Sequence, residues 1–148
     1  MNKNIMIFAI LMAGGIAMAF LPVSDPYLDT KFTQTYCGLG YMRDIGPAAL
    51  SYDSSYSSEI TSIRSDLISS GRSLQSYCYA DNRASFNQEY QSEFVPLLNQ
   101  MTAIYFKAAF NYAVMNPGSL PMILNEYLGF QMDRQDCIEN NRQYCGAV

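Results

Sequence analysis

The stretch that decides the fold spans residues 82–115 and reads NRASFNQEYQSEFVPLLNQMTAIYFKAAFNYAVM. Apolar side chains recur in it at spacings of three and four, which is the period of an amphipathic α-helix. The members of this stripe are Phe86, Tyr90, Phe94, Leu97, Met101, Ile104, Ala108 and Tyr112. The stripe keeps its phase across Pro96, although proline removes one helical hydrogen bond. The stretch therefore predicts one long helix, kinked at Pro96, at the centre of a small helical protein.

A second apolar facet lies about 150° around the same predicted helix. Its members are Val95, Phe106, Phe110 and Ala113. A helix with two apolar facets normally packs against two neighbours, and burial is the usual fate of phenylalanine. The alternative is that Phe106 and Phe110 stay exposed and bind a partner, because exposed apolar patches mark interaction sites.

Helical signals also precede this stretch. Pro26 suits a first helical turn, and the apolar spacing predicts a short helix over 26–37 that gives way to a glycine-interrupted passage. Alternating spacings of three and four then predict a helix over 53–78. Ser70 and Gly71 thin the apolar seam of that helix, so a neighbouring helix is expected to approach it closely.

Helical signals follow the stretch as well. The sequence Asn-Pro-Gly-Ser at 116–119 predicts a turn. Apolar residues from Leu120 to Met132 predict a last helix, and the polar residues 133–144 predict a frayed helix end and a tail held by Cys145. The N-terminal side of the central helix is expected to be capped by Asp81 or Asn82.

The N-terminus predicts export. Lys3 is followed by an uncharged apolar run, and Ala17-Met18-Ala19 places small residues where a signal peptidase cleaves. We therefore expect residues 1–19 to be a cleaved signal peptide and residues 20–148 to form one helical domain. Because the uncharged run is nearly long enough to span a bilayer, an uncleaved anchor is the alternative, with membrane contact only through residues 1–23.

Four cysteines, Cys37, Cys78, Cys137 and Cys145, fit an exported chain with two disulfides. Antiparallel packing of consecutive helices favours Cys78 with Cys137 and Cys37 with Cys145. The second pairing considered joins Cys37 to Cys78 and Cys137 to Cys145. A metal site is not expected, because no cysteine pair has a metal-ligand spacing and the chain has no histidine.

Charge and composition point away from several function classes. The chain has 9 basic and 13 acidic residues, and the basic residues do not cluster along the sequence, so nucleic-acid binding is not expected. Without histidine there is no Ser-His or Cys-His pair, and no cofactor motif is present, so we do not expect an enzyme. The twelve tyrosines suit contact surfaces, and Tyr77 and Tyr79, beside Cys78, are further candidates for binding.

The sequence as a whole predicts an all-α, disulfide-stapled bundle of three long helices and a short N-terminal helix, behind an export segment. The function expected from it is a non-enzymatic binding module in the periplasm, at the cell surface or outside the cell, acting through apolar and tyrosine contacts. Its partner is expected to be another protein or a second copy of the chain. A structural or assembly subunit of the cell envelope, held by an uncleaved N-terminal helix, is the alternative.

Overall fold

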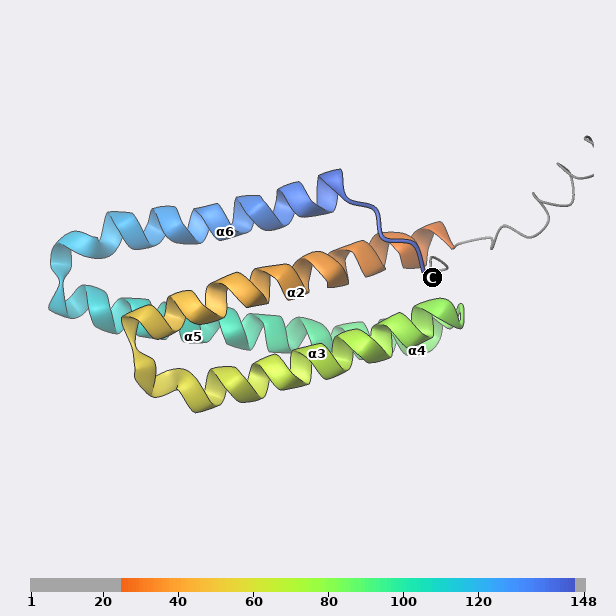
Figure 1. Cartoon of the computed structure of the whole chain (residues 1–148), viewed down its shortest axis with the longest axis horizontal. Helices are drawn as coiled ribbons and strands as arrows, with labels where there is room; N and C mark the ends of the chain where they lie inside the picture. The colour runs from red at the N-terminus through yellow and green to blue at the C-terminus, as the bar shows by residue number, and fades with distance from the viewer. Residues whose placement is uncertain (1–24, 146–148) are drawn as a thin grey trace, which may run out of the picture.

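The computed structural model describes residues 25–145, which form four long helical segments and contain no strand. The segments are α2 (Pro26–Tyr52), α3 (Ser57–Tyr79), the continuous rod of α4 (Arg83–Glu89), η2 (Tyr90–Phe94) and α5 (Val95–Met115), and α6 (Leu120–Asn140). Short 3-10 turns, η1 (Ser54–Tyr56) and η3 (Pro117–Ser119), lie in two of the connections. Consecutive segments run antiparallel (Figure 1). The all-helical bundle expected from the sequence is confirmed, whereas the predicted export segment at residues 1–19 lies outside the described residues.

The prediction of a short first helix is wrong, because α2 runs unbroken from Pro26 to Tyr52. Asp25 caps its start by accepting a hydrogen bond from the Tyr27 N–H at 2.9 Å. Gly38 and Gly46 lie where the helix meets its neighbours: a Cβ on Gly38 would lie 3.0 Å from Leu98 Cδ1 and 3.1 Å from the ring of Phe94. Packing against other helices therefore outweighs the low helix propensity of these residues.

α2 is also the most central helix of the bundle, since it packs against α3, α5 and α6 (Figure 1). Its buried side chains include Leu28, Tyr41, Met42 and Ile45. The stretch 82–115 supplies much of the remaining core but packs mainly against α2 and α3. The bundle is thus built around the segment whose sequence gave the weaker helical signal.

The predicted continuity of the helix across Pro96 is confirmed. The chain passes through Pro96 without leaving the helix, and the five residues just before Val95 form a π turn. The Val95 N–H donates to the Tyr90 carbonyl, five residues back. This π turn adds a residue to the helical repeat, so the stripe does not keep its predicted phase: Leu98 is buried whereas Leu97 is only half-buried, and Tyr105 is buried beside Met101 and Ile104.

The seam predicted for α3 is confirmed, although the helix begins at Ser57 after the η1 turn. Ile60, Ile63, Leu67 and Leu74 are buried along it. The expected close approach also occurs, because a Cβ on Gly71 would lie 3.0 Å from Leu39 Cδ1 of α2. As predicted, Asn82 caps the next helix, accepting a hydrogen bond from the Ser85 N–H at 3.1 Å.

α6 extends further than its apolar residues indicated, reaching Asn140. It packs mainly against α2, and Ile123 is its only fully buried residue within the described part of the chain. None of the helices in residues 25–145 is both long and apolar enough to cross a membrane.

The two expected disulfides are present, but both pairings considered from the sequence are wrong. The structure joins Cys37 to Cys137, with Cα atoms 5.8 Å apart, and Cys78 to Cys145, with Cα atoms 5.2 Å apart. The favoured pairing assumed that the end of the last helix packs beside the start of the central helix, next to Cys78. α6 instead packs along α2, which places Cys137 beside Cys37.

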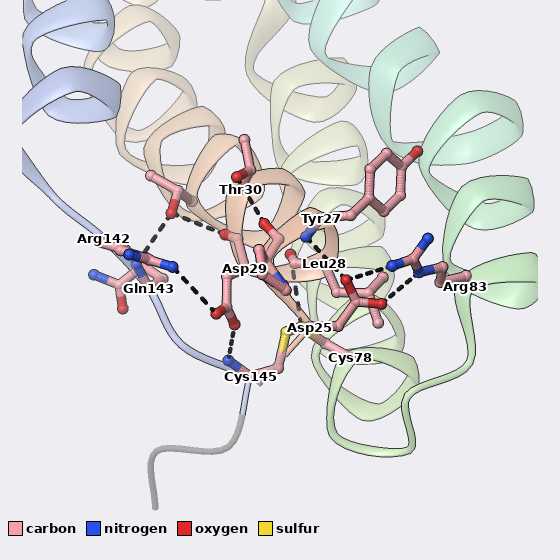
Figure 2. Close-up of polar contacts among 12 residues, drawn as sticks. Asp25, Tyr27, Leu28, Asp29, Thr30, Cys78, Arg83, Arg142, Gln143 and Cys145 are labelled. Atoms are coloured by element: carbon pink, nitrogen blue, oxygen red, sulfur yellow. Dashed lines mark hydrogen bonds and ion pairs between the residues drawn. A yellow bond between two sulfur atoms is a disulfide. The ribbon is translucent and has the colours of Figure 1, made fainter. Parts of the chain in front are cut away.

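The C-terminal tail returns across the start of α2 to reach Cys78 (Figure 2). The Cys145 N–H donates to Asp29 Oδ1 at 2.8 Å, and the Gln143 N–H donates to Thr33 Oγ1 at 3.0 Å. Asp29 is fully buried, and Arg142 Nη2 lies 4.0 Å from its second carboxylate oxygen. A buried carboxylate on the first turn of α2 thus holds the tail next to the second disulfide.

Candidate interaction surface

Exposed apolar side chains gather in one part of the bundle. Within residues 25–145, every large aliphatic or phenylalanine side chain that is exposed lies between Phe106 and Met132. These residues are Phe106, Phe110, Val114, Met115, Leu120, Met122, Leu124, Leu128 and Met132. The other exposed large hydrophobic residues are four tyrosines, whose side chains carry a polar hydroxyl: Tyr27, Tyr36, Tyr79 and Tyr144.

Seven of the nine residues form two regular stripes, which together we name the apolar face. Phe106, Phe110 and Val114 follow each other at intervals of four on α5, and Leu120, Leu124, Leu128 and Met132 do so on α6. An interval of four places side chains on one side of a helix, one turn above the other. Each helix therefore presents a continuous apolar stripe to solvent.

The two stripes border the same junction between α5 and α6. The rings of Phe106 and Tyr127 pack with their centroids 4.6 Å apart. Tyr127 lies next to Leu128 and three residues after Leu124, on the flank of α6 that turns toward α5. The Phe106 stripe and the Leu124 stripe consequently meet across this ring contact.

Charge is nearly absent from this part of the chain. Residues 108–132 contain a single ionisable acid or base among Asp, Glu, Lys and Arg, which is Glu126. Its carboxylate points inward and accepts hydrogen bonds from Tyr52 at 2.9 Å and from Tyr105 at 3.1 Å. With roughly half of each of its seven side chains exposed, the apolar face reaches the size of the largest patches on monomeric proteins, about 300–600 Å².

The tyrosines that join α5 to α6 have shifted acidities. Burial raises the pKa of Tyr52 to about 12, and the neighbouring carboxylate of Glu126 adds to the shift. Burial and the same carboxylate also raise the pKa of Tyr105 above its ordinary value. Both tyrosines therefore stay protonated at neutral pH and act as hydrogen-bond donors that hold α6 in place.

The binding residues predicted from the sequence lie at two separate places in the structure. Phe106 is 39% exposed and Phe110 is 67% exposed, so both belong to the surface, while Val95 and Ala113 of the same facet are half-buried. Tyr77 is half-buried and Tyr79 is exposed near the Cys78–Cys145 disulfide, at the opposite end of the bundle. The structure therefore does not bring the tyrosine pair and the phenylalanine pair together.

The α6 half of the apolar face was missed in the sequence. In the sequence, Leu120, Leu124, Leu128 and Met132 indicate a last helix but do not distinguish its sides. Their strict interval of four was the available signal. What the interval cannot show is that the core-facing side of α6 is formed by Ile123, Tyr127 and Phe130.

No group of three or more Cys, Asp or Glu side chains in residues 25–145 is arranged to hold a metal ion. Comparison with known proteins finds no match to this chain among protein-family models, curated proteins or solved structures.

Proposed function

We propose that this protein is an exported, non-enzymatic binding module that docks the apolar face onto a partner protein. The observation that carries the proposal is the gathering of all exposed large aliphatic and phenylalanine side chains of residues 25–145 into one region. Scattered exposed apolar residues are normal on a protein surface, whereas a contiguous patch usually marks an interaction site.

Two features support export. The apolar segment at residues 5–23 and the Ala17-Met18-Ala19 sequence have the layout of a secretory signal. All four cysteines are paired in disulfides, which form and persist in oxidising compartments such as the periplasm and the extracellular space. Export also agrees with a binding role that needs no cytosolic cofactor.

The chemistry of the partner follows from the charges of this chain. The apolar face has an uncharged centre, and the exposed acids Asp133 and Asp136 follow its last member on α6, while Lys107 lies beside Phe106 on α5. The chain as a whole carries a net charge of −4. Electrostatic complementarity therefore favours a partner surface that is apolar at its centre and mainly basic at its rim.

Site-specific crosslinking in the compartment of the native protein tests this proposal. A photoreactive phenylalanine analogue placed at position 110 or 124 is expected to give one discrete adduct with another protein. The same analogue at position 72, on the exposed side of α3, is the matched control. A second substitution, Leu128→Asp, should abolish the adduct because it places a charge in the contact. Equal labelling from position 72, or an adduct insensitive to Leu128→Asp, would contradict the proposal.

The alternative function is a structural or assembly subunit in which the apolar face pairs with a second copy. Its favouring observation is the lack of charge on the face, which removes like-charge repulsion between two identical surfaces. Light scattering with size-exclusion chromatography separates the two. A dimer that dissociates in the Leu124→Asp variant would favour assembly, and a monomer at high concentration would eliminate it.

Two chemical observations support a non-enzymatic role. The chain has no histidine to act as a general base, and all four sulfur atoms are in disulfides, so a thiolate nucleophile is not available in the oxidised protein. Glu126, the only acid within residues 108–132, already accepts hydrogen bonds from two tyrosines. The side chains of the apolar face can therefore contact a partner, but they include neither a histidine nor a thiolate.

A further inference from the structure

A cavity of about 500 Å³ opens on a different side of the bundle from the apolar face. It lies over α2 and is bounded by α3 on one side and α6 on the other, the two helices that flank α2 in Figure 1. Its volume falls within the range of about 300–1,000 Å³ that is usual for small-molecule sites. The Cys37–Cys137 disulfide fixes α6 to α2 at its edge.

Arginines concentrate at this cavity although the protein is acidic. Arg43, Arg64 and Arg134 line it, one from each of the three bounding helices, and they are three of only 9 basic residues in the chain. Asp44 and Asp133 line it as well. The sequence shows no basic cluster because Arg43 and Arg134 are 91 residues apart. Only the packing of α2, α3 and α6 brings the three arginines together.

The ion pairing inside the cavity is incomplete. Arg43 pairs with Asp44 at 3.3 Å on the exposed rim. Within residues 25–145, no carboxylate lies within 4.0 Å of the guanidinium nitrogens of Arg64 or Arg134. Two cationic side chains, on opposite walls, are therefore left without a negative partner.

Arg134 is held in place by a stacked ring. Its guanidinium carbon lies 5.4 Å from the centroid of the Tyr41 ring. The Tyr41 hydroxyl is in turn fixed, at 2.9 Å from Thr102 Oγ1 and at 3.2 Å from the donating Gln131 Nε2. The Arg134 Nε is shielded from solvent and has no hydrogen-bond acceptor in the described structure. Because that nitrogen is shielded from solvent, an anion in the cavity would meet the other guanidinium nitrogens of Arg134.

Apolar side chains make up much of the rest of the lining, beside the polar side chains of Tyr36 and Asn141. Leu39, Met42, Ile68 and Phe130 contribute side chains, and a Cβ on Gly40 would meet no atom within 4 Å. Gly40 thus leaves open the space that a larger residue would fill. The cavity combines an apolar floor with two unpaired guanidinium groups, an arrangement that suits a molecule with both an apolar body and an anionic group.

We propose that this cavity binds a small organic anion. The apolar body of the ligand lies over Gly40 against Ile68 and Phe130, and its carboxylate, sulfonate or phosphate group accepts hydrogen bonds from Arg64 and Arg134. Guanidinium groups bind such oxyanions through strong, charge-assisted hydrogen bonds. The site is separate from the apolar face and does not depend on the function proposed for that face.

Binding of the fluorescent probe anilinonaphthalene sulfonate to the intact oxidised protein tests the proposal. The neutral analogue phenylnaphthylamine, which has the apolar rings without the sulfonate, is the matched probe. We expect Arg64→Gln and Arg134→Gln each to weaken binding of the sulfonate by about tenfold or more and to leave binding of the neutral probe within about twofold. Gly40→Leu should weaken binding of both probes, because it fills the cavity.

Two controls make the result decisive. Arg72→Gln removes a charge from an exposed position of α3 that does not line the cavity, and it should leave both affinities unchanged. Leu124→Asp reports any probe bound to the apolar face, and it should not alter the affinity difference between the two probes. Because Arg64 is exposed, Arg64→Gln keeps the test valid even if Arg134→Gln impairs folding. Sulfonate binding to Arg64→Gln within twofold of binding to Arg72→Gln would overturn the proposal.

Discussion

The Tyr105 hydroxyl donates a hydrogen bond to Glu126 Oε1 at 3.1 Å, and it also lies 3.3 Å from the Ile123 carbonyl oxygen. Tyr52 donates to the other carboxylate oxygen of Glu126 at 2.9 Å. One carboxylate on α6 is thereby joined to α2 and α5 at once. Ile123 is the only fully buried residue of α6 in the described structure, so this polar link adds to the Cys37–Cys137 disulfide and to the packing of Tyr127 and Phe130 in attaching the helix.

The link between Tyr52 and Glu126 predicts loss of stability at alkaline pH. The pKa of Tyr52 is raised from 10.0 to about 12 in the folded protein. Between these two values the unfolded chain has lost the proton that the folded chain retains, so the free energy of unfolding falls as pH rises through this window. Below pH 10 the contribution is fully present. Thermal unfolding followed from pH 8 to about pH 12 should show this decline, and Tyr52→Phe should make it shallower, while the raised pKa values of Tyr105, Tyr41 and Tyr90 maintain the rest. An unchanged slope in Tyr52→Phe would contradict the assignment.

The two glycines Gly38 and Gly40 predict opposite effects of the same substitution. Gly38→Ala places a Cβ 3.0 Å from Leu98 Cδ1 and 3.1 Å from the Phe94 ring, so overpacking should lower stability by about 1–3 kcal/mol. Gly40→Ala meets no atom within 4 Å and should raise stability by up to about 1 kcal/mol, because alanine is the better helix former. Urea unfolding of both variants measures the difference. Equal effects would show that helix propensity, and not packing, decides both positions.

The buried carboxylate of Asp29 predicts that the C-terminal tail depends on an acceptor at this position. Asp29→Ala leaves the Cys145 N–H without its partner at 2.8 Å and should lower stability by about 1–3 kcal/mol. The Cys78–Cys145 disulfide should also be reduced faster by dilute dithiothreitol, because the tail is released. Asp29→Asn is the control, since its amide oxygen can still accept from Cys145. If Asp29→Asn lowers the free energy of unfolding as much as Asp29→Ala does, the negative charge facing Arg142 matters more than the hydrogen bond to Cys145.

The exposure of Phe110 and the packing of Phe106 predict a graded response to charge. Phe110→Asp should change the free energy of unfolding by no more than about 0.5 kcal/mol, because two thirds of the side chain is already in water. Phe106→Asp should cost about 1–2 kcal/mol, since it loses the ring contact with Tyr127 at 4.6 Å. Denaturant unfolding measures both. Failure of Phe110→Asp to fold would mean that its ring is part of the core and does not belong to the apolar face.

Local pattern in the sequence was enough to predict the helices of residues 53–78 and 82–115, the cap at Asn82 and the presence of two disulfides. These features depend on side-chain period, capping chemistry and cysteine number, which are properties of neighbouring residues. The same kind of reasoning failed for α2, because its glycines are unfavourable in an isolated helix, whereas Gly38 is accepted here for the close approach of Phe94 and Leu98.

The sequence by itself determined the all-helical class, the oxidised cysteines and which side chains are apolar. Only the tertiary structure decided that α6 packs along α2, and that choice pairs Cys37 with Cys137 and brings Arg43, Arg64 and Arg134 around one cavity. It also left the Leu120–Met132 stripe in water beside Phe106 and Phe110. The physical reason is that the helical period depends on residues three and four positions apart, whereas the choice of neighbouring helix depends on contacts between residues far apart in the chain.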